Sequence, residues 1–205
     1  VGNGNFDQDV AGIGRTGDSN HTQSHSAGLI VVNRTFLQDN GDWLTFGHLT
    51  VTNSKTTADL PTSGDWATAL SPMRWARHWY FSRTDAAGTT GGTVDLIFDF
   101  SEGGMGGQSP VGPASNYRLL KRSGTTGAFS DIATATAIVG DQVQFLGVDV
   151  NLLGSNFTLG TLNDTSSPTA ISLNTFEAMP TDRASEPFGQ LGLALILAVS
   201  GAALV

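Results

Sequence analysis

The stretch YRLLKRSGTTGAFSDIATATAIVGDQVQFLGVDV, residues 117–150, decides the fold class. Its runs of β-branched and apolar residues are short, and turns such as SGTTGA and VGDQ separate them. Runs of this length bounded by turn residues are typical of strands. The stretch therefore predicts strands at 117–122, 132–139 and 141–150.

The same pattern continues through most of the chain. It predicts five further strands, at 29–33, 43–51, 77–83, 93–100 and 156–162. The sequence DNGD at 39–42 predicts a tight hairpin turn in which Asn40-Gly41 supplies positive φ. Together these strands predict an all-β fold, a β-sandwich or jelly-roll-like domain over residues 29–162.

The segments on either side of this domain differ from it in composition. Residues 1–28 are rich in Gly, Asn, Ser and Asp, which predicts an irregular arm with one short strand or turn at Val10–Ile13. We expect Val10–Ile13 to lie against a β-domain, either its own or a neighbour's. Residues 163–185 form a Ser/Thr/Pro-rich linker, and residues 186–205 are predicted to be a hydrophobic C-terminal α-helix.

Composition limits the classes of partner. Only 14% of the residues are charged and the net charge is −8, with ten scattered Lys and Arg, so a nucleic-acid partner is not expected. Lys121-Arg122 is predicted to be a solvated strand end. The 26 glycines, the many Ser and Thr and the absence of cysteine predict an extracellular protein without disulfides. Because the sequence starts at Val1, we expect that a secretion signal has been removed.

The C-terminal tail LGLALILAVSGAALV (191–205) allows three interpretations: a membrane-anchor helix, a strand donated to a neighbour, or a helix buried in a polymer core. Its Leu and Ala content favours a helix starting near Ser185-Glu186-Pro187. Small residues at every fourth position give a ridge along which helices pack closely. The predicted assembly residues are Leu191, Ala194, Leu195, Ala198 and Ala202.

Several stretches resemble an uncharacterised β-domain family of secreted and cell-surface bacterial proteins. They are VAGIGR (10–15), RHWY within 77–104, and YRLL within 117–145, and the likeness covers about residues 8–162. The tail, with SEPFGQ (185–190) before the apolar run, is similar to C-terminal sorting signals of the Glu-Pro type, although their Arg-rich end is missing here. The resemblance implies an exported, surface-exposed module and supplies no catalytic residues.

Catalysis is not expected, and neither is a cofactor. The sequence has no G-x-S-x-G, H-E-x-x-H or P-loop motif. Glycosidase chemistry needs only two well-placed carboxylates, for which Asp95, Asp99 and Glu102 are the best candidates. We interpret Asp99 and Glu102 as turn residues instead.

Metal binding is also weighed and not expected. His21 and His25 have the i,i+4 spacing of helical ligands, but HTQSH lies in a polar arm with only Asp18 nearby. The acidic stretches NFDQD (5–9) and DNGD (39–42) offer oxygen ligands for a hard cation, yet neither matches a twelve-residue calcium loop. We interpret both as turns.

Aromatic residues and sequons remain as candidate surface features. The aromatic set either fills the core, which we favour, or forms a sugar-stacking platform; it consists of Trp43, Trp66, Trp75, Trp79 and Tyr80. The triplet GDW occurs twice, at 41–43 and 64–66. Four asparagines begin N-x-Ser/Thr sequons and are candidate glycosylation sites: Asn20, Asn33, Asn156 and Asn163.

Taken together, these features predict a non-catalytic structural subunit of an extracellular, pilus-like surface filament. In this hypothesis the C-terminal helices form the core of a homopolymer, and the arm 1–28 of one subunit completes an edge of the next. The alternative is a surface-anchored adhesin or carbohydrate-binding module, whose partners are the cell envelope or surface glycans and whose tail is an anchor.

Overall fold

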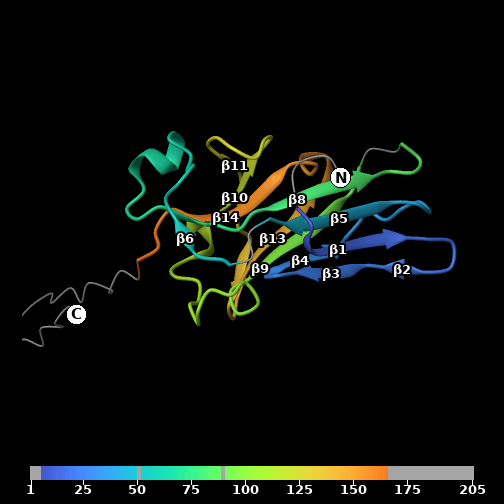
Figure 1. Cartoon of the computed structure of the whole chain (residues 1–205), viewed down its shortest axis with the longest axis horizontal. Coiled ribbons are helices and arrows are strands. Elements are labelled where there is room, and N and C mark those ends of the chain that lie inside the picture. Colours follow the sequence, from blue (N-terminus) through green and yellow to red (C-terminus); the bar gives the residue numbers. More distant parts are fainter. Residues whose placement is uncertain (1–5, 50–51, 89–90, 166–205) are drawn as a thin grey trace, which may run out of the picture. The chain divides into compact units, whose positions relative to one another are not determined.

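A computed structural model of the chain describes residues 6–49, 52–88 and 91–165. Within these ranges the strands form two antiparallel sheets, and the helices are short 3-10 turns (Figure 1). The 3-10 turns are η1 (Gly64–Thr68), η2 (Ala114–Asn116) and η3 (Val150–Leu152). The all-β prediction is confirmed, and the arrangement is that of a β-sandwich.

The larger sheet has the strand order β11-β10-β14-β8-β5-β1-β2, with β7 paired to β14 and β6 paired to β7. Its strands are β1 (Gln8–Arg15), β2 (Asn20–His21), β5 (Trp43–His48), β6 (Lys55–Thr56), β7 (Met73–Trp75), β8 (Trp79–Thr84), β10 (Tyr117–Arg122), β11 (Ser130–Thr134) and β14 (Asn156–Thr161).

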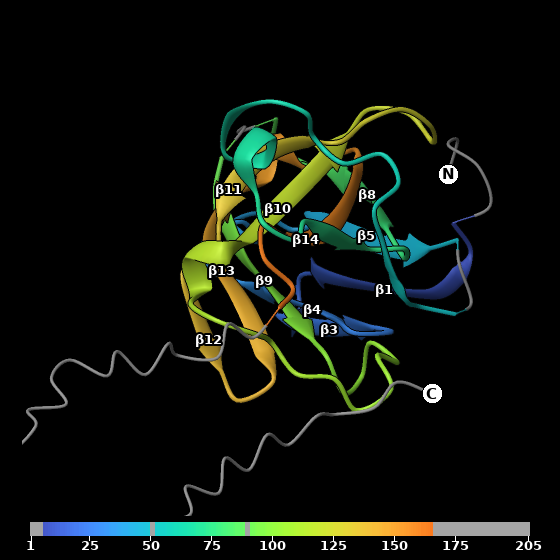
Figure 2. The ribbon, with the colours of Figure 1, turned by 90° about the vertical axis from the view of Figure 1, so that its left-hand side faces the viewer.

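The smaller sheet has the order β12-β13-β9-β4-β3. Its strands are β3 (Gln23–Ser26), β4 (Leu29–Asn33), β9 (Thr93–Asp99), β12 (Ala137–Val139) and β13 (Gln142–Asp149). Figure 2 shows the two sheets as layers, with β5 and β14 in one and β4, β9 and β3 in the other.

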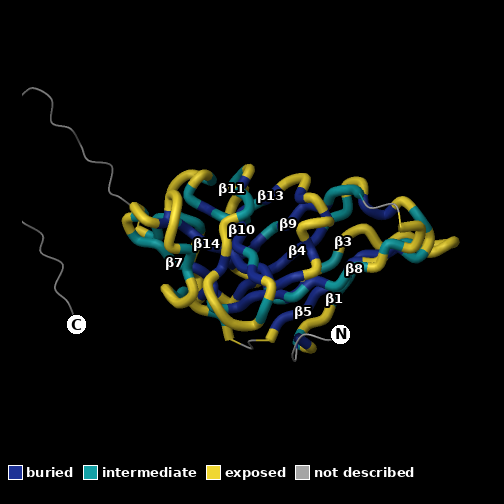
Figure 3. Tube along the Cα trace, turned by 90° about the horizontal axis from the view of Figure 1, so that it is seen from above, coloured by how far each residue is buried: buried dark blue, intermediate teal, exposed yellow. Residues whose placement is uncertain are grey.

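The main core lies between the sheets. Alternate residues of β5, Leu44, Phe46 and His48, are all buried, as their shared face in the sequence predicts. Rings of the two sheets meet directly, because the Trp79 and Phe98 ring centroids are 5.7 Å apart. Figure 3 shows the burial along the strands and the exposed loops at both ends of the sandwich.

The prediction of an irregular arm over residues 1–28 is wrong for its described part. β1 pairs along most of its length with β5 of the same chain, and β2 and β3 continue into the two sheets. Ile13 is fully buried in the main core. Val10–Ile13 therefore lies against its own domain, and this strand is already paired within its own subunit.

Two connections also differ from the prediction. The stretch 132–139 is not one strand but parts of β11 and β12, which belong to different sheets. The DNGD turn does not close a hairpin, because it lies between β4 of the smaller sheet and β5 of the larger one. Gly41 does have the predicted positive φ, at 95°.

The chain divides into two compact units at residue 168, of which the first contains both sheets. The predicted helix 186–205 and most of the linker 163–185 lie outside the described residues, as do all five assembly residues: Leu191, Ala194, Leu195, Ala198 and Ala202. In the ranges that the structure describes, no helix has the length and apolar character needed to span a bilayer.

Candidate functional site

The outer face of the larger sheet has a covered half and an open half. The covered half carries a second, smaller core of Trp66, Leu120 and Phe129, which the segment around η1 encloses. The open half is formed by the ends of β1, β5 and β8 near Trp43, beyond the part of β5 and β8 that Phe6 covers at Gly47 and Tyr80. We call its outward residues near the ends of these strands, Gly14, Trp43, Thr45 and Ser82, the Trp43 face.

Trp43 is held on this face by the absence of a side chain beside it. Gly14 is its direct cross-strand partner, and a Cβ atom added at Gly14 would lie 2.0 Å from the nearest indole carbon. The indole therefore lies against the β1 backbone, while 41% of the residue stays exposed. An exposed aromatic ring held flat on a sheet is a rigid surface for stacking.

A polar pocket lies at the same end of the sheet. It has a volume of about 310 Å³ and is lined by Arg15, Asn40 and the β1–β2 turn from Thr16 to Asn20. Arg15 follows Gly14 directly, and Asn20 precedes His21, the cross-strand partner of Gly14 in β2. The pocket therefore begins one residue beyond Gly14 along β1, and none of its lining residues belongs to the Trp43 face.

Internal hydrogen bonds hold the loops around this pocket in place. The Arg15 guanidinium donates to the carbonyl oxygen of Gln38 at 2.5 Å, and the Thr16 hydroxyl donates to Asp18 Oδ1 at 3.1 Å. The Asp42 carboxylate accepts from the N–H groups of Gln38, Asp39 and Ala86 at 2.7–3.0 Å. The pocket walls are thus pre-organised.

Asp42 is accordingly a structural anion. Burial works to raise the pKa of its carboxyl, but the N–H groups of Asp39, Ala86 and Gln38 all donate to it, and Arg15 adds a positive charge nearby. The net result is a pKa below the usual value. Asp42 is one of the two acids of the DNGD stretch. The hydrogen bonds occupy both oxygens of its carboxylate, which supports the interpretation of DNGD as a turn.

The five aromatic candidates separate into core and surface residues. Trp75 and Trp79 belong to the main core and Trp66 to the smaller one, as the favoured interpretation predicts. Tyr80 is half-buried, and its ring lies 5.8 Å from that of Phe6. Trp43 is the member of the set that a ligand reaches most easily.

The three candidate catalytic carboxylates make structural contacts. Asp95 pairs with Arg34 and accepts the Gly147 N–H at 2.8 Å. Burial works to raise the pKa of Asp99, but hydrogen bonds from Glu102 N–H, Ser101 and Gln142 lower it below its usual value. Glu102 is exposed and lies 3.2 Å from His25 Nδ1. Glu102 lies in the turn after β9, as predicted, whereas Asp99 is the last residue of β9 and its carboxylate accepts hydrogen bonds from that turn.

The candidate metal ligands are also distributed over separate elements. His21 lies in β2 and His25 in β3, which belong to different sheets, so they do not share a helix face. Asp18 lies in the β1–β2 turn, where it accepts from Thr16. Among the described residues no three His, Asp or Glu side chains are grouped as metal ligands.

The four sequon asparagines have different environments. Asn20 is exposed at the polar pocket. Asn33 and Asn163 are half-buried and use their side-chain oxygens to accept nearby backbone N–H groups. Asn156 is fully buried, and its Nδ2 donates to the Gly124 carbonyl at 2.9 Å, so the folded domain leaves no room for a glycan there. The expectation for Asn156 is therefore wrong.

A buried cationic cluster under the covered half was missed by the sequence reasoning. Arg74 and Arg122 lie 4.9 and 4.3 Å from the Phe129 ring centroid and share the Asp59 carboxylate. Arg122 is buried, so the prediction that Lys121-Arg122 is a solvated strand end is wrong for Arg122. The sequence of a strand does not show whether a second layer covers a charged residue on its outward face.

His78 belongs to the same cluster and is held neutral. Arg122 Nη2 lies 3.2 Å from His78 Nε2, and because a guanidinium only donates, Nε2 must be the accepting nitrogen. Burial, and then the positive charge of Arg122, lower the pKa of His78 from 6.5 to about 4. A neutral imidazole is therefore part of the folded domain at neutral pH.

No family model matches the chain, and no curated protein or solved structure matches it. The geometry of the site is thus what any functional proposal has to rest on.

Proposed function

We propose that this chain is a non-catalytic, surface-displayed binding module that recognises glycans through the Trp43 face and the adjoining polar pocket. The observation that carries the proposal is the exposed indole of Trp43, fixed against Gly14 beside a pocket of hydroxyl, amide and charged groups. Sugar rings combine apolar C–H faces with a rim of hydroxyls, and this surface offers a partner for each.

The position of the site within the domain supports display from a tether. In Figure 1 the β1–β2, β4–β5 and β8–β9 loops gather at one end of the sandwich, and the orange segment that ends the described part of the chain lies at the other. A chain held through its C-terminal side would present these loops outward. The similarity of residues 185–205 to Glu-Pro sorting signals, and the acidic, cysteine-free composition, support an extracellular or cell-surface location.

The test is glycan-array binding by the full chain and by Trp43→Ala. Loss of one stacking contact should weaken binding on the order of tenfold, which corresponds to about 1.4 kcal/mol. Leu70→Ala is the matched control, because Leu70 is 82% exposed and is remote in sequence from the Trp43 face. Absence of glycan binding by the unmodified chain, or equal binding by Trp43→Ala, would contradict the proposal.

A homopolymeric filament is a second proposal, favoured by the apolar tail sequence with Ala194, Ala198 and Ala202 spaced four residues apart. Sedimentation separates it from the first. If the full chain polymerises and a variant lacking residues 186–205 stays monomeric, the tail is an assembly element. If both sediment as monomers, the tail serves display alone and the filament proposal is wrong.

A further inference from the structure

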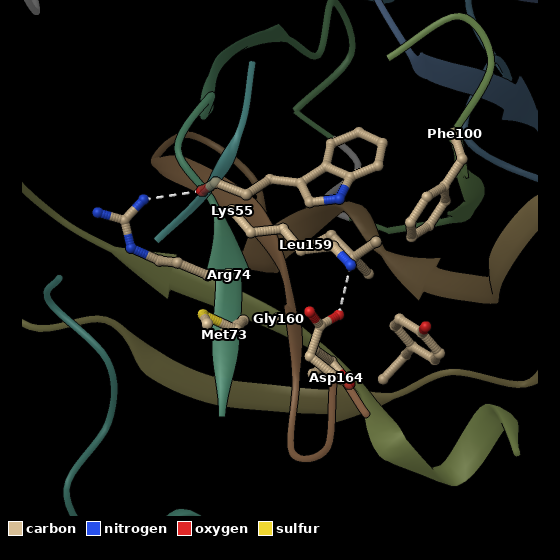
Figure 4. A pocket seen from close by; sticks show the side chains of 10 residues that line it. Lys55, Met73, Arg74, Phe100, Leu159, Gly160 and Asp164 are labelled. Carbon is tan, nitrogen blue, oxygen red and sulfur yellow. Dashed lines mark hydrogen bonds and ion pairs between the residues drawn. The ribbon is translucent and has the colours of Figure 1, made fainter. Parts of the chain in front are cut away.

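Lys55 and Asp164 form an ion pair in a small cavity close to the last strand. Lys55 Nζ lies 2.6 Å from Asp164 Oδ1, and Figure 4 shows the lysine side chain reaching past Leu159 to the carboxylate. Lys55 is one of two lysines in the chain. The pair connects the early strand β6 to a residue three positions after β14.

The surroundings of this pair are largely apolar. The Lys55 and Asp164 side chains are 19% and 17% exposed. Apolar and aromatic residues line much of the cavity: Met73, Trp75, Phe100, Tyr117 and Leu159. The cavity measures about 10 Å³, close to the minimum that holds one water molecule. Two opposite charges in such a place lose much of their hydration.

Backbone pairing fixes both partners. Lys55 is paired with Trp75 in the β6–β7 ladder. The Asp164 N–H donates to the Ser71 carbonyl at 2.9 Å, and Asn163 forms a bridge with Ser71. The nitrogen and the carboxyl group are therefore held together by the fold itself. Such positioning replaces a bimolecular encounter with an intramolecular one.

From this geometry we propose that Lys55 and Asp164 join to form an intramolecular amide cross-link. The ammonium first transfers a proton to the carboxylate that it touches, giving an amine and a carboxylic acid. The Nζ lone pair then attacks Cγ and forms the C–N bond. A second Nζ proton moves to the hydroxyl oxygen, the C–O bond breaks, and one water molecule leaves.

The surroundings of the pair favour the amide product. The amide product carries no charge and suits an apolar cavity better than two ions do. Exclusion of water also slows hydrolysis of the amide. Asp164 is the sole acid lining the cavity in the described part of the chain, so the pair exchanges its own protons.

The cross-link would join residue 55 to residue 164, just before the described part of the chain ends. Tension applied through the C-terminal side would then reach β6 through a covalent bond instead of acting on β14 alone. A chain without cysteine has no disulfide for this purpose. The inference does not depend on glycan binding.

Intact-mass spectrometry of the full 205-residue chain tests it. We expect a mass lower than that of the sequence by one water molecule. Trypsin digestion of the denatured protein should give residues 35–74, uncut at Lys55, joined to residues 123–183. A full sequence mass with normal cleavage after Lys55 would show that the pair is ionic only and would overturn the proposal.

Four variants make the test specific. Lys55→Arg keeps the positive charge but should abolish the mass loss, and Asp164→Ala should do the same. Lys121→Arg, which changes the other lysine, should retain it. Asp164→Asn should lose ammonia in place of water, because the amide nitrogen is then the leaving group. Persistence of the water loss in Lys55→Arg would overturn the assignment to this pair.

Discussion

The two GDW triplets place tryptophans on the same outer face of the same sheet, with different outcomes. The second triplet, Gly64-Asp65-Trp66, lies within η1, and its Trp66 lies over Gly160 and is 6% exposed. Its Nε1 donates to Asp131 Oδ2 at 2.9 Å. Trp43 follows the Gly41-Asp42 turn, lies over Gly14, and is 41% exposed.

Both tryptophans lie over a glycine, but in the described part of the chain only Trp66 is covered by a second segment. At both positions a glycine lets an indole approach the strand, since an added Cβ would lie 2.8 Å from Trp66 and 2.0 Å from Trp43. Over Gly160, the segment around η1 and Phe129 close a second core. Over Gly14 no residue of that core is present. The covering segment therefore decides whether the tryptophan stabilises the fold or faces a partner.

Removal of the two indoles is the strongest test of this comparison. Trp66→Ala should lower the free energy of unfolding by about 3–5 kcal/mol, because it opens a cavity and leaves Asp131 without the indole donor. Trp43→Ala should lower it by less than about 1 kcal/mol, because 41% of the residue is exposed already and the second core does not cover it. Urea denaturation of both variants measures the difference.

The comparison would fail if both variants lost the same stability. Trp66→Phe is a useful intermediate, since it keeps an aromatic ring and removes the donor to Asp131. It should fall between the wild type and Trp66→Ala.

Acidification should also act on the covered half. The pKa of His78 is lowered to about 4 in the folded state, so the unfolded chain binds a proton at this residue first as the pH falls. Stability from His78 is therefore complete above about pH 6.5 and lost progressively down to about pH 4. The difference between these two pKa values corresponds to about 3 kcal/mol.

Denaturation measured at several pH values between 4 and 7 tests this expectation. His78→Gln, which keeps an acceptor for Arg122, should flatten the dependence in this window. His21→Gln changes an exposed histidine of the open half and should leave it unaltered. An unchanged slope in His78→Gln would show that His78 is not the titrating group.

The strands that could be predicted from the sequence are those whose own residues are enough to determine a strand. Residues 29–33 and 117–122 match β4 and β10 in full, because apolar and β-branched runs between turn residues have few alternatives. The Gly, Asn, Ser and Asp content of residues 1–28 predicts an irregular arm where the structure has β1. The pairing of β1 with β5 overrides that composition, and a single sequence does not contain this tertiary information.

The candidate site was predictable only as a set of residue types. Trp43 stood among five aromatic candidates, and both GDW triplets look alike locally. Their separation depends on which strands lie beside them and on what covers them. The same holds for Arg122, whose burial follows from the Phe129 layer above β10 and not from the pattern within β10.

The smallest expected loss of stability comes from the glycine beneath Trp43. Gly14→Ala should cost less than about 1 kcal/mol, because the exposed indole can turn away from the new methyl group. Its β-strand backbone needs no positive φ, so the change acts on Trp43 alone. If glycan binding depends on the flat indole, Gly14→Ala should weaken it nearly as much as Trp43→Ala. Gly160→Ala is the matched change in the covered half, where the methyl group would meet the buried side chains of Leu120 at 2.7 Å and Trp66 at 2.8 Å. That overpacking should cost about 1–3 kcal/mol. Equal losses of stability in the two alanine variants would mean that Trp43 is as confined as Trp66, and the open half would then be no better suited to a partner than the covered one.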